Sequence, residues 1–91
     1  MKQVLKFEVE PDGFTLIVSK KHKFVLFDEQ KPGELTVWIE QEIECEEKVR
    51  VGLFAAATGY NKMGDEWTHV YSTLMRSNGT VWHLYVCEKE L

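Results

Sequence analysis

The chain lacks an apolar run long enough to cross a bilayer, and its first residues lack the basic, apolar and small-residue regions of a signal peptide. We therefore expect a protein of the cytoplasm that makes no membrane contact. Cysteine is also scarce. Cys45 and Cys87 could pair in principle, but free thiols are expected in a reducing compartment.

Basic charge is also in short supply. Eleven Lys and Arg residues stand against fifteen Asp and Glu residues, a formal net charge of −4. Proteins that bind nucleic acid by neutralising phosphates usually present a basic face, so direct nucleic-acid binding is not expected. The one basic run is Lys20-Lys21-His22-Lys23. It is typical of a solvated turn between strands, and the functional alternative is a local contact with an anion or phosphate.

The composition is otherwise that of a globular protein, with 44% hydrophobic and 29% charged residues, so disordered and fibrous classes are excluded. Ninety-one residues predict one domain, spanning residues 1–91, near the lower limit for folding on a single core. A core this small leaves room for help from oligomerisation, and a homo-oligomer is expected. Three Trp and five Phe exceed what a minimal core needs, which suggests a partner surface or a ligand.

The strongest local pattern is a C-terminal β-hairpin. Residues 67–75 and 80–86 are rich in β-branched and aromatic side chains, and Asn78-Gly79 lies between them. Asn-Gly favours a tight turn with positive φ at both central residues. The second run is apolar on both faces, which is typical of a central or interface strand.

Shorter alternating runs predict strands along the rest of the chain, with residues 2–18 forming a first hairpin. Pro32-Gly33 fits a type II turn. Glu40 to Glu47 carries five glutamates and is interpreted as a loop. A helix through Ala55-Ala56-Ala57 competes with a strand, but Gly59 and the short length disfavour it. We predict an all-β fold, a small antiparallel sandwich or barrel of about six to seven strands. The expected strands are residues 4–10, 14–18, 23–27, 35–40, 48–57, 67–75 and 80–86.

The longest irregular stretch, residues 58–66, is where function is expected, because long loops on compact β domains often carry it. Gly59 and Gly64 do not form a phosphate loop, since the Lys-Ser/Thr that should follow is absent. A nucleotide could still be held by backbone N–H groups and by stacking on Tyr60. The predicted ligand-binding residues are Tyr60, Asn61, Lys62 and Trp67 for stacking and polar contacts, and Lys21 or Lys23 for phosphate.

Neither a metal site nor a catalytic site is expected. His69, His83 and Cys87 could meet on the hairpin, but they lack a paired metal-ligand signature, and histidines packed on a strand face explain them better. Ser72 or Thr73 could lie beside His83 across the hairpin, but no nucleophile elbow and no orienting Asp accompany them. We therefore predict no enzyme activity, no cofactor and no metal.

Four short motifs are spread over nearly the whole chain: Leu5-Lys6-Phe7, the Trp-containing strand Leu35 to Glu40, the loop Thr58-Gly59-Tyr60, and Thr73 followed by Thr80-Val81-Trp82-His83-Leu84-Tyr85-Val86. Together they resemble the motifs of a family of small bacteriophage proteins of unknown function. The chain departs from that family at two places. Tyr60 stands where the family usually has His, and Val18-Ser19 stands where a Met-Pro is common.

The resemblance implies a phage or prophage origin. By analogy with small acidic phage proteins that antagonise host machinery, it implies a non-enzymatic binding protein in the host cytoplasm. One form would be an oligomeric sponge that sequesters a nucleotide-type immune signal. The first alternative is a protein–protein inhibitor of a host defence protein, in which Glu40 to Glu47 mimics a charged partner. The second is a virion or assembly component.

Overall fold

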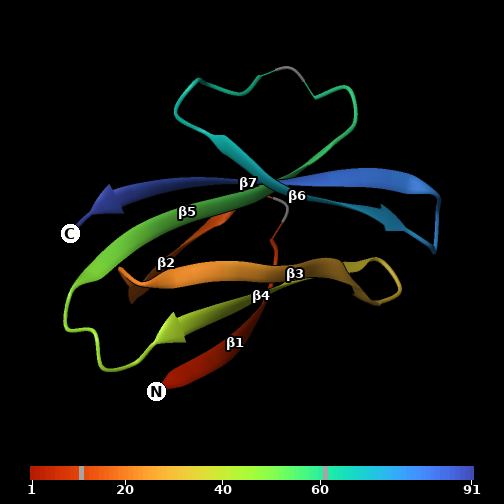
Figure 1. Ribbon diagram of the computed structural model, residues 1–91. Coiled ribbons are helices and arrows are strands. Elements are labelled where there is room, and N and C mark those ends of the chain that lie inside the picture. Colours follow the sequence, from red (N-terminus) through yellow and green to blue (C-terminus); the bar gives the residue numbers. More distant parts are fainter. Residues whose placement is uncertain (11, 61) are drawn as a thin grey trace.

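Strands from distant parts of the chain pair to form two sheets. The computed structural model describes residues 1–10, 12–60 and 62–91, which contain seven strands and no helix. The two antiparallel sheets face each other as a sandwich and do not close into a barrel (Figure 1). The all-β prediction is confirmed in its sandwich form. The strands are β1 (Lys2–Glu8), β2 (Phe14–Ser19), β3 (His22–Lys31), β4 (Glu34–Glu42), β5 (Lys48–Ala57), β6 (Thr68–Met75) and β7 (Thr80–Glu90).

The sheets have the strand orders β1-β4-β3 and β2-β5-β7-β6. The first hairpin predicted for residues 2–18 is therefore wrong, because β1 pairs with β4 and β2 pairs with β5. The pairing with β4 places Phe7 beside Val37, so β1 extends an apolar face that turns toward the interior. Pro11, part of the turn expected between β1 and β2, lies outside the described residues.

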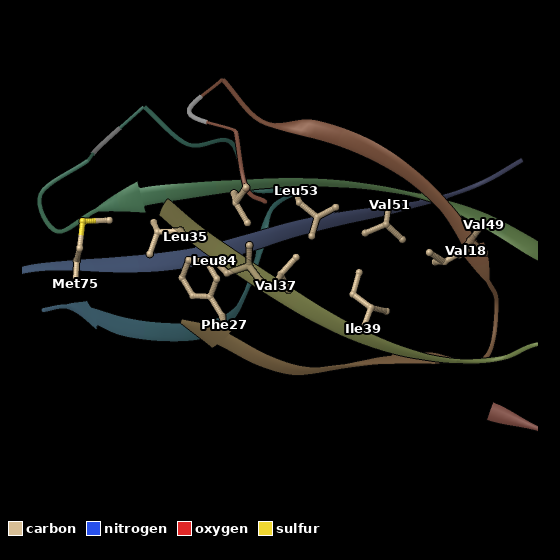
Figure 2. Packing of buried hydrophobic residues seen from close by; sticks show 11 residues of the cluster. Val18, Phe27, Leu35, Val37, Ile39, Val49, Val51, Leu53, Met75 and Leu84 are labelled. Atoms are coloured by element: carbon tan, nitrogen blue, oxygen red, sulfur yellow. The ribbon is translucent and has the colours of Figure 1, made fainter. Parts of the chain in front are cut away.

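The core between the sheets is largely aliphatic. Val37, Ile39 and Leu84 are completely buried, and alternate residues of each strand point inward as a two-residue period requires. Burying one such side chain contributes roughly 1.5–3 kcal/mol relative to exposure. Figure 2 shows inward side chains of both sheets meeting in one layer. The buried cluster comprises Val9, Val18, Phe27, Leu35, Val37, Ile39, Val49, Val51, Leu53, Met75 and Leu84.

Polar contacts between β3 and the β6–β7 hairpin join the sheets along one edge. The Tyr71 hydroxyl donates to the Val25 carbonyl at 3.0 Å. The buried Glu29 carboxylate accepts hydrogen bonds from the backbone N–H and the hydroxyl of Ser77, and from the Gly33 N–H at 2.8 Å. These donors, the Ser77 hydroxyl foremost, hold the pKa of Glu29 below its ordinary value of 4.5.

The turn between β6 and β7 differs from the predicted one. Met75 pairs with Thr80, so four residues connect the strands, and the Gly79 N–H donates to the Met75 carbonyl at 2.8 Å. Gly79 has a φ of 74°, whereas Asn78 does not have a positive φ, so the expected turn with two positive φ angles is not formed. The contacts of Ser77 with Glu29 favour the longer turn, because they draw it toward β3. β7 is an inner strand, as its two apolar faces predicted.

Three smaller expectations concern the end of β4, the alanines of β5 and the turn at Gly33. Part of the predicted loop Glu40 to Glu47 is strand, because β4 continues to Glu42, opposite Lys2 of β1. The alanines belong to β5, so the helical alternative is wrong. Gly33, with a φ of 80°, fits the type II turn. The described part of the chain contains no helix with the length and apolar character of a membrane span.

Candidate functional site

An aromatic cluster covers the outer face of the four-stranded sheet, on the side away from the core. Phe54 of β5 and Tyr85 of β7 are directly opposite, and their rings stack with centroids 5.9 Å apart. The Trp67 ring meets Phe54 edge-on at 4.8 Å, and the Tyr60 ring lies 5.9 Å from Phe54. The connection between β5 and β6, which rises above the sheet in Figure 1, therefore brings its aromatic residues back onto β5.

Gly52 makes room for Trp67 on this face. A Cβ atom at Gly52 would lie 3.2 Å from the Cη2 atom of the Trp67 ring, a tight contact. Gly52 is two residues from Phe54, so the two residues point to the same face of β5. A strand position without a side chain thus lets the indole pack directly against the backbone.

The cluster borders an open hollow of about 630 Å³, which we call the aromatic hollow. This volume is within the range that holds small molecules, and such sites combine apolar walls with a few polar groups. Tyr60 is 51% exposed, so part of this side chain is accessible to a ligand in the hollow. The lining residues are Asp12, Gly13, Phe14, Thr15, Gly52, Leu53, Phe54, Ala55, Tyr60, Lys62, Met63 and Trp67.

Two smaller hollows adjoin the aromatic hollow. One, of about 270 Å³, shares Thr15, Gly52 and Trp67 with it. The other, of about 180 Å³, shares Tyr60 and Met63 with it. The shared lining residues place the three hollows next to one another as a strip on the outer face of the sheet, beside the connection from β5 to β6.

A hydrogen-bonded chain of side chains lies at one end of this strip. The Ser72 hydroxyl is 2.7 Å from Nδ1 of His83 and 2.8 Å from Nε2 of His69, and Nε2 of His83 is 2.9 Å from the Thr58 hydroxyl. The juxtaposition of Ser72 and His83 considered from the sequence is thus observed. Thr58 rather than an Asp holds the second nitrogen of that imidazole. Among the described residues, no three or more His, Cys, Asp or Glu side chains are grouped to hold a metal ion.

The structure brings together three of the six predicted ligand residues. Tyr60, Lys62 and Trp67 all line the aromatic hollow, and Asn61 lies outside the described residues. The lysines proposed for phosphate are elsewhere: Lys21 and Lys23 line a separate groove with residues of β4. Sequence proximity could not reveal this separation, because it depends on which sheet each strand joins.

Part of the acidic run is neutralised by ion pairs. Lys20 Nζ lies 3.2 Å from Glu47, and Lys23 Nζ lies 3.5 Å from Glu40. Glu42 accepts a hydrogen bond from the amino group of Met1, which lowers the pKa of this carboxyl below its ordinary value. The run is therefore less negative than its sequence indicates.

The sequence interpretation missed the residues that the sheet supplies to the site. Phe54, Tyr85 and Gly52 were not among the predicted ligand residues because they lie in predicted strands. A usable signal was present: Phe54 alternates with the inward Leu53 and therefore had to point outward. A glycine inside a strand often marks a place where another group approaches the backbone closely, and at Gly52 that group is the Trp67 ring.

Comparison with known proteins assigns the family but no activity. No curated protein and no solved structure matches the chain. The match to a protein family covers residues 1–90 and so includes every strand described above. The chain therefore belongs to the family described as a domain of unknown function, DUF7352.

Proposed function

We propose that this chain is a small non-enzymatic binding protein that captures a nucleotide-type ligand in the aromatic hollow. The observation that carries the proposal is the convergence of Phe54, Trp67 and Tyr60 on one open hollow of about 630 Å³. Flat rings of this kind bind nucleobases by stacking, which contributes roughly 1–3 kcal/mol per base. Lys62 at the same hollow adds a cation to an otherwise acidic protein.

The resemblance to small phage proteins extends this proposal to a biological role. A phage protein in the host cytoplasm would counter a host defence by sequestering the nucleotide signal of that defence. Self-association would place several binding sites on each oligomer. This role rests on the resemblance alone, whereas the binding site rests on the geometry of the outer face.

The alternative, a protein–protein inhibitor that uses Glu40 to Glu47, has less support. Its carboxylates are partly engaged by Lys20, Lys23 and the amino group of Met1. A charge mimic works through unpaired charges that a partner can meet. The ion pairs within the chain therefore favour the ligand-binding proposal.

Native mass spectrometry of the protein purified from bacteria with an active nucleotide-signalling defence tests the proposed function. We expect the wild-type chain to carry an adduct of nucleotide mass, and the spectrum also reports the oligomer number. The double substitution Tyr60→Ala and Lys62→Ala should remove the adduct and leave the circular dichroism spectrum unchanged, since both side chains lie on an exposed loop.

The matched control is Lys21→Ala with Lys23→Ala, which removes charge from the separate groove. This control should keep the adduct. A bare wild-type protein would contradict capture of a nucleotide. An adduct that survives in the Tyr60/Lys62 variant but disappears in the Lys21/Lys23 variant would move the site to the other groove.

A further inference from the structure

Two basic residues lie directly opposite each other beside the aromatic hollow. Arg50 of β5 pairs in register with Lys89 of β7, and both are exposed. Each is two residues from a member of the Gly52–Cys87 pair, so both point to the outer face of the sheet. Like charges in directly opposed cross-strand positions destabilise a sheet. A pair of this kind is explained more readily by binding than by stability.

Neither cation forms an ion pair with an acidic residue in the described part of the chain. Within the described ranges, all ion pairs of the protein involve other residues, and neither Arg50 nor Lys89 has a carboxylate oxygen within 4.0 Å. This contrasts with the basic run before β3, where Lys20 and Lys23 both have glutamate partners. Arg50 and Lys89 are therefore available to an external anion.

Both cations line the hollow of about 270 Å³ that shares Thr15, Gly52 and Trp67 with the aromatic hollow. Glu66 also lines it, so two positive charges face one negative charge and leave an excess of one positive charge. The Trp67 ring forms part of both hollows. A ligand with a ring on one side of Trp67 and an anionic group on the other would use both hollows at once.

We propose that Arg50 and Lys89 form an anion subsite for the phosphate of a nucleoside 5′-monophosphate whose base lies in the aromatic hollow. The proposal rests on the proposed function and names the residues that replace Lys21 and Lys23 as phosphate ligands. Arg50 is two residues from Gly52, about 7 Å along the strand, a separation that the sugar of a nucleotide can bridge. Arg and Lys donate charge-assisted hydrogen bonds to phosphate oxygens, the guanidinium through two parallel N–H groups.

Isothermal titration calorimetry with adenosine, adenosine 5′-monophosphate and inorganic pyrophosphate tests the subsite. The wild-type protein should bind the monophosphate at least about tenfold more tightly than adenosine, because only the former makes charge-assisted bonds. The double substitution Arg50→Gln and Lys89→Gln should abolish this preference and leave adenosine binding unchanged. Glu66→Gln should tighten monophosphate binding severalfold by removing the opposing charge.

The matched control is Lys6→Gln with Lys31→Gln, two exposed cations of the other sheet, which changes the net charge equally. Its preference for the monophosphate should equal that of the wild type. A preference that persists in the Arg50/Lys89 variant overturns the subsite but leaves the proposed function standing. Pyrophosphate binding that depends on Arg50 and Lys89, without binding of adenosine or of adenosine 5′-monophosphate, supports the anion site and overturns the nucleotide function. Absence of binding for all three probes overturns both.

Discussion

The inner and outer faces of β5 and β7 are built from the same strands but differ in chemistry and in cover. On the inner face Leu53 and Leu84 are 1% and 0% exposed, and the opposite sheet covers them (Figure 2). On the outer face Phe54 and Tyr85 are only partly buried, and the covering residues come from the connection between β5 and β6. Buried apolar side chains are therefore concentrated on the inner face, whereas the outer face leaves aromatic side chains within reach of a ligand.

The largest expected effect tests the inner face. Leu84→Ala removes a completely buried side chain from the centre of the core, and we expect a loss of about 2–5 kcal/mol in the free energy of unfolding. Tyr85→Ala, one residue along on the outer face, should cost clearly less, because its ring is partly exposed. Urea denaturation measures both, and equal losses would contradict the division between the faces.

The second prediction concerns the packing of Trp67 against Gly52 on the outer face. In Gly52→Val, branched methyl groups would occupy the space now filled by the Trp67 ring and displace it from β5. We expect a loss of about 1–3 kcal/mol, as in other overpacked sites, together with loss of nucleotide binding. Near-ultraviolet circular dichroism reports the movement of the indole. Unaltered binding with a displaced indole would show that Trp67 does not shape the site.

A smaller effect concerns the edge where the two sheets meet. Because the pKa of Glu29 is lowered in the folded protein, its carboxylate stabilises the fold above its ordinary pKa of 4.5. That stabilisation is lost as the pH falls below 4.5 and through the folded-state pKa. Glu29→Gln should lower the urea midpoint of unfolding at pH 7. It should also make the midpoint fall less between pH 5 and pH 3 than it does in the wild type. The control is Glu34→Gln, at an exposed position, and its urea midpoint should fall between pH 5 and pH 3 as much as that of the wild type.

The smallest effect is expected in the exposed histidine network. Ser72→Ala removes the hydroxyl between His69 and His83, and the free energy of unfolding should change by no more than about 0.5 kcal/mol. The ¹⁵N shifts of the His83 imidazole should change, because Nδ1 loses its partner. A loss above about 2 kcal/mol would instead place this network among the structural supports of the sheet.

Local sequence patterns predicted where the strands lie. They did not predict which strands pair, because pairing joins segments that are distant in the sequence. The alternation around Val37 and the apolar run ending at Val86 correctly indicated strands. The hairpin predicted for residues 2–18 failed because each of its strands pairs with a later strand, which no nearby turn signal reveals. The candidate site followed the same rule. Tyr60 and Trp67, from one loop, were predicted to belong to one site, and both line the aromatic hollow, whereas Lys21 and Lys23 line a separate groove because of the sheet order.

The most direct test of the outer face as a binding surface is an amide ¹H–¹⁵N titration with adenosine 5′-monophosphate. We expect shift changes at Phe54, Tyr85 and the Trp67 indole N–H, with the indoles of Trp38 and Trp82 unchanged as internal references. This pattern would locate the ligand in the aromatic hollow. Changes confined to the groove of Lys21 and Lys23, or no changes at millimolar nucleotide, would contradict the assignment of the aromatic face to ligand capture.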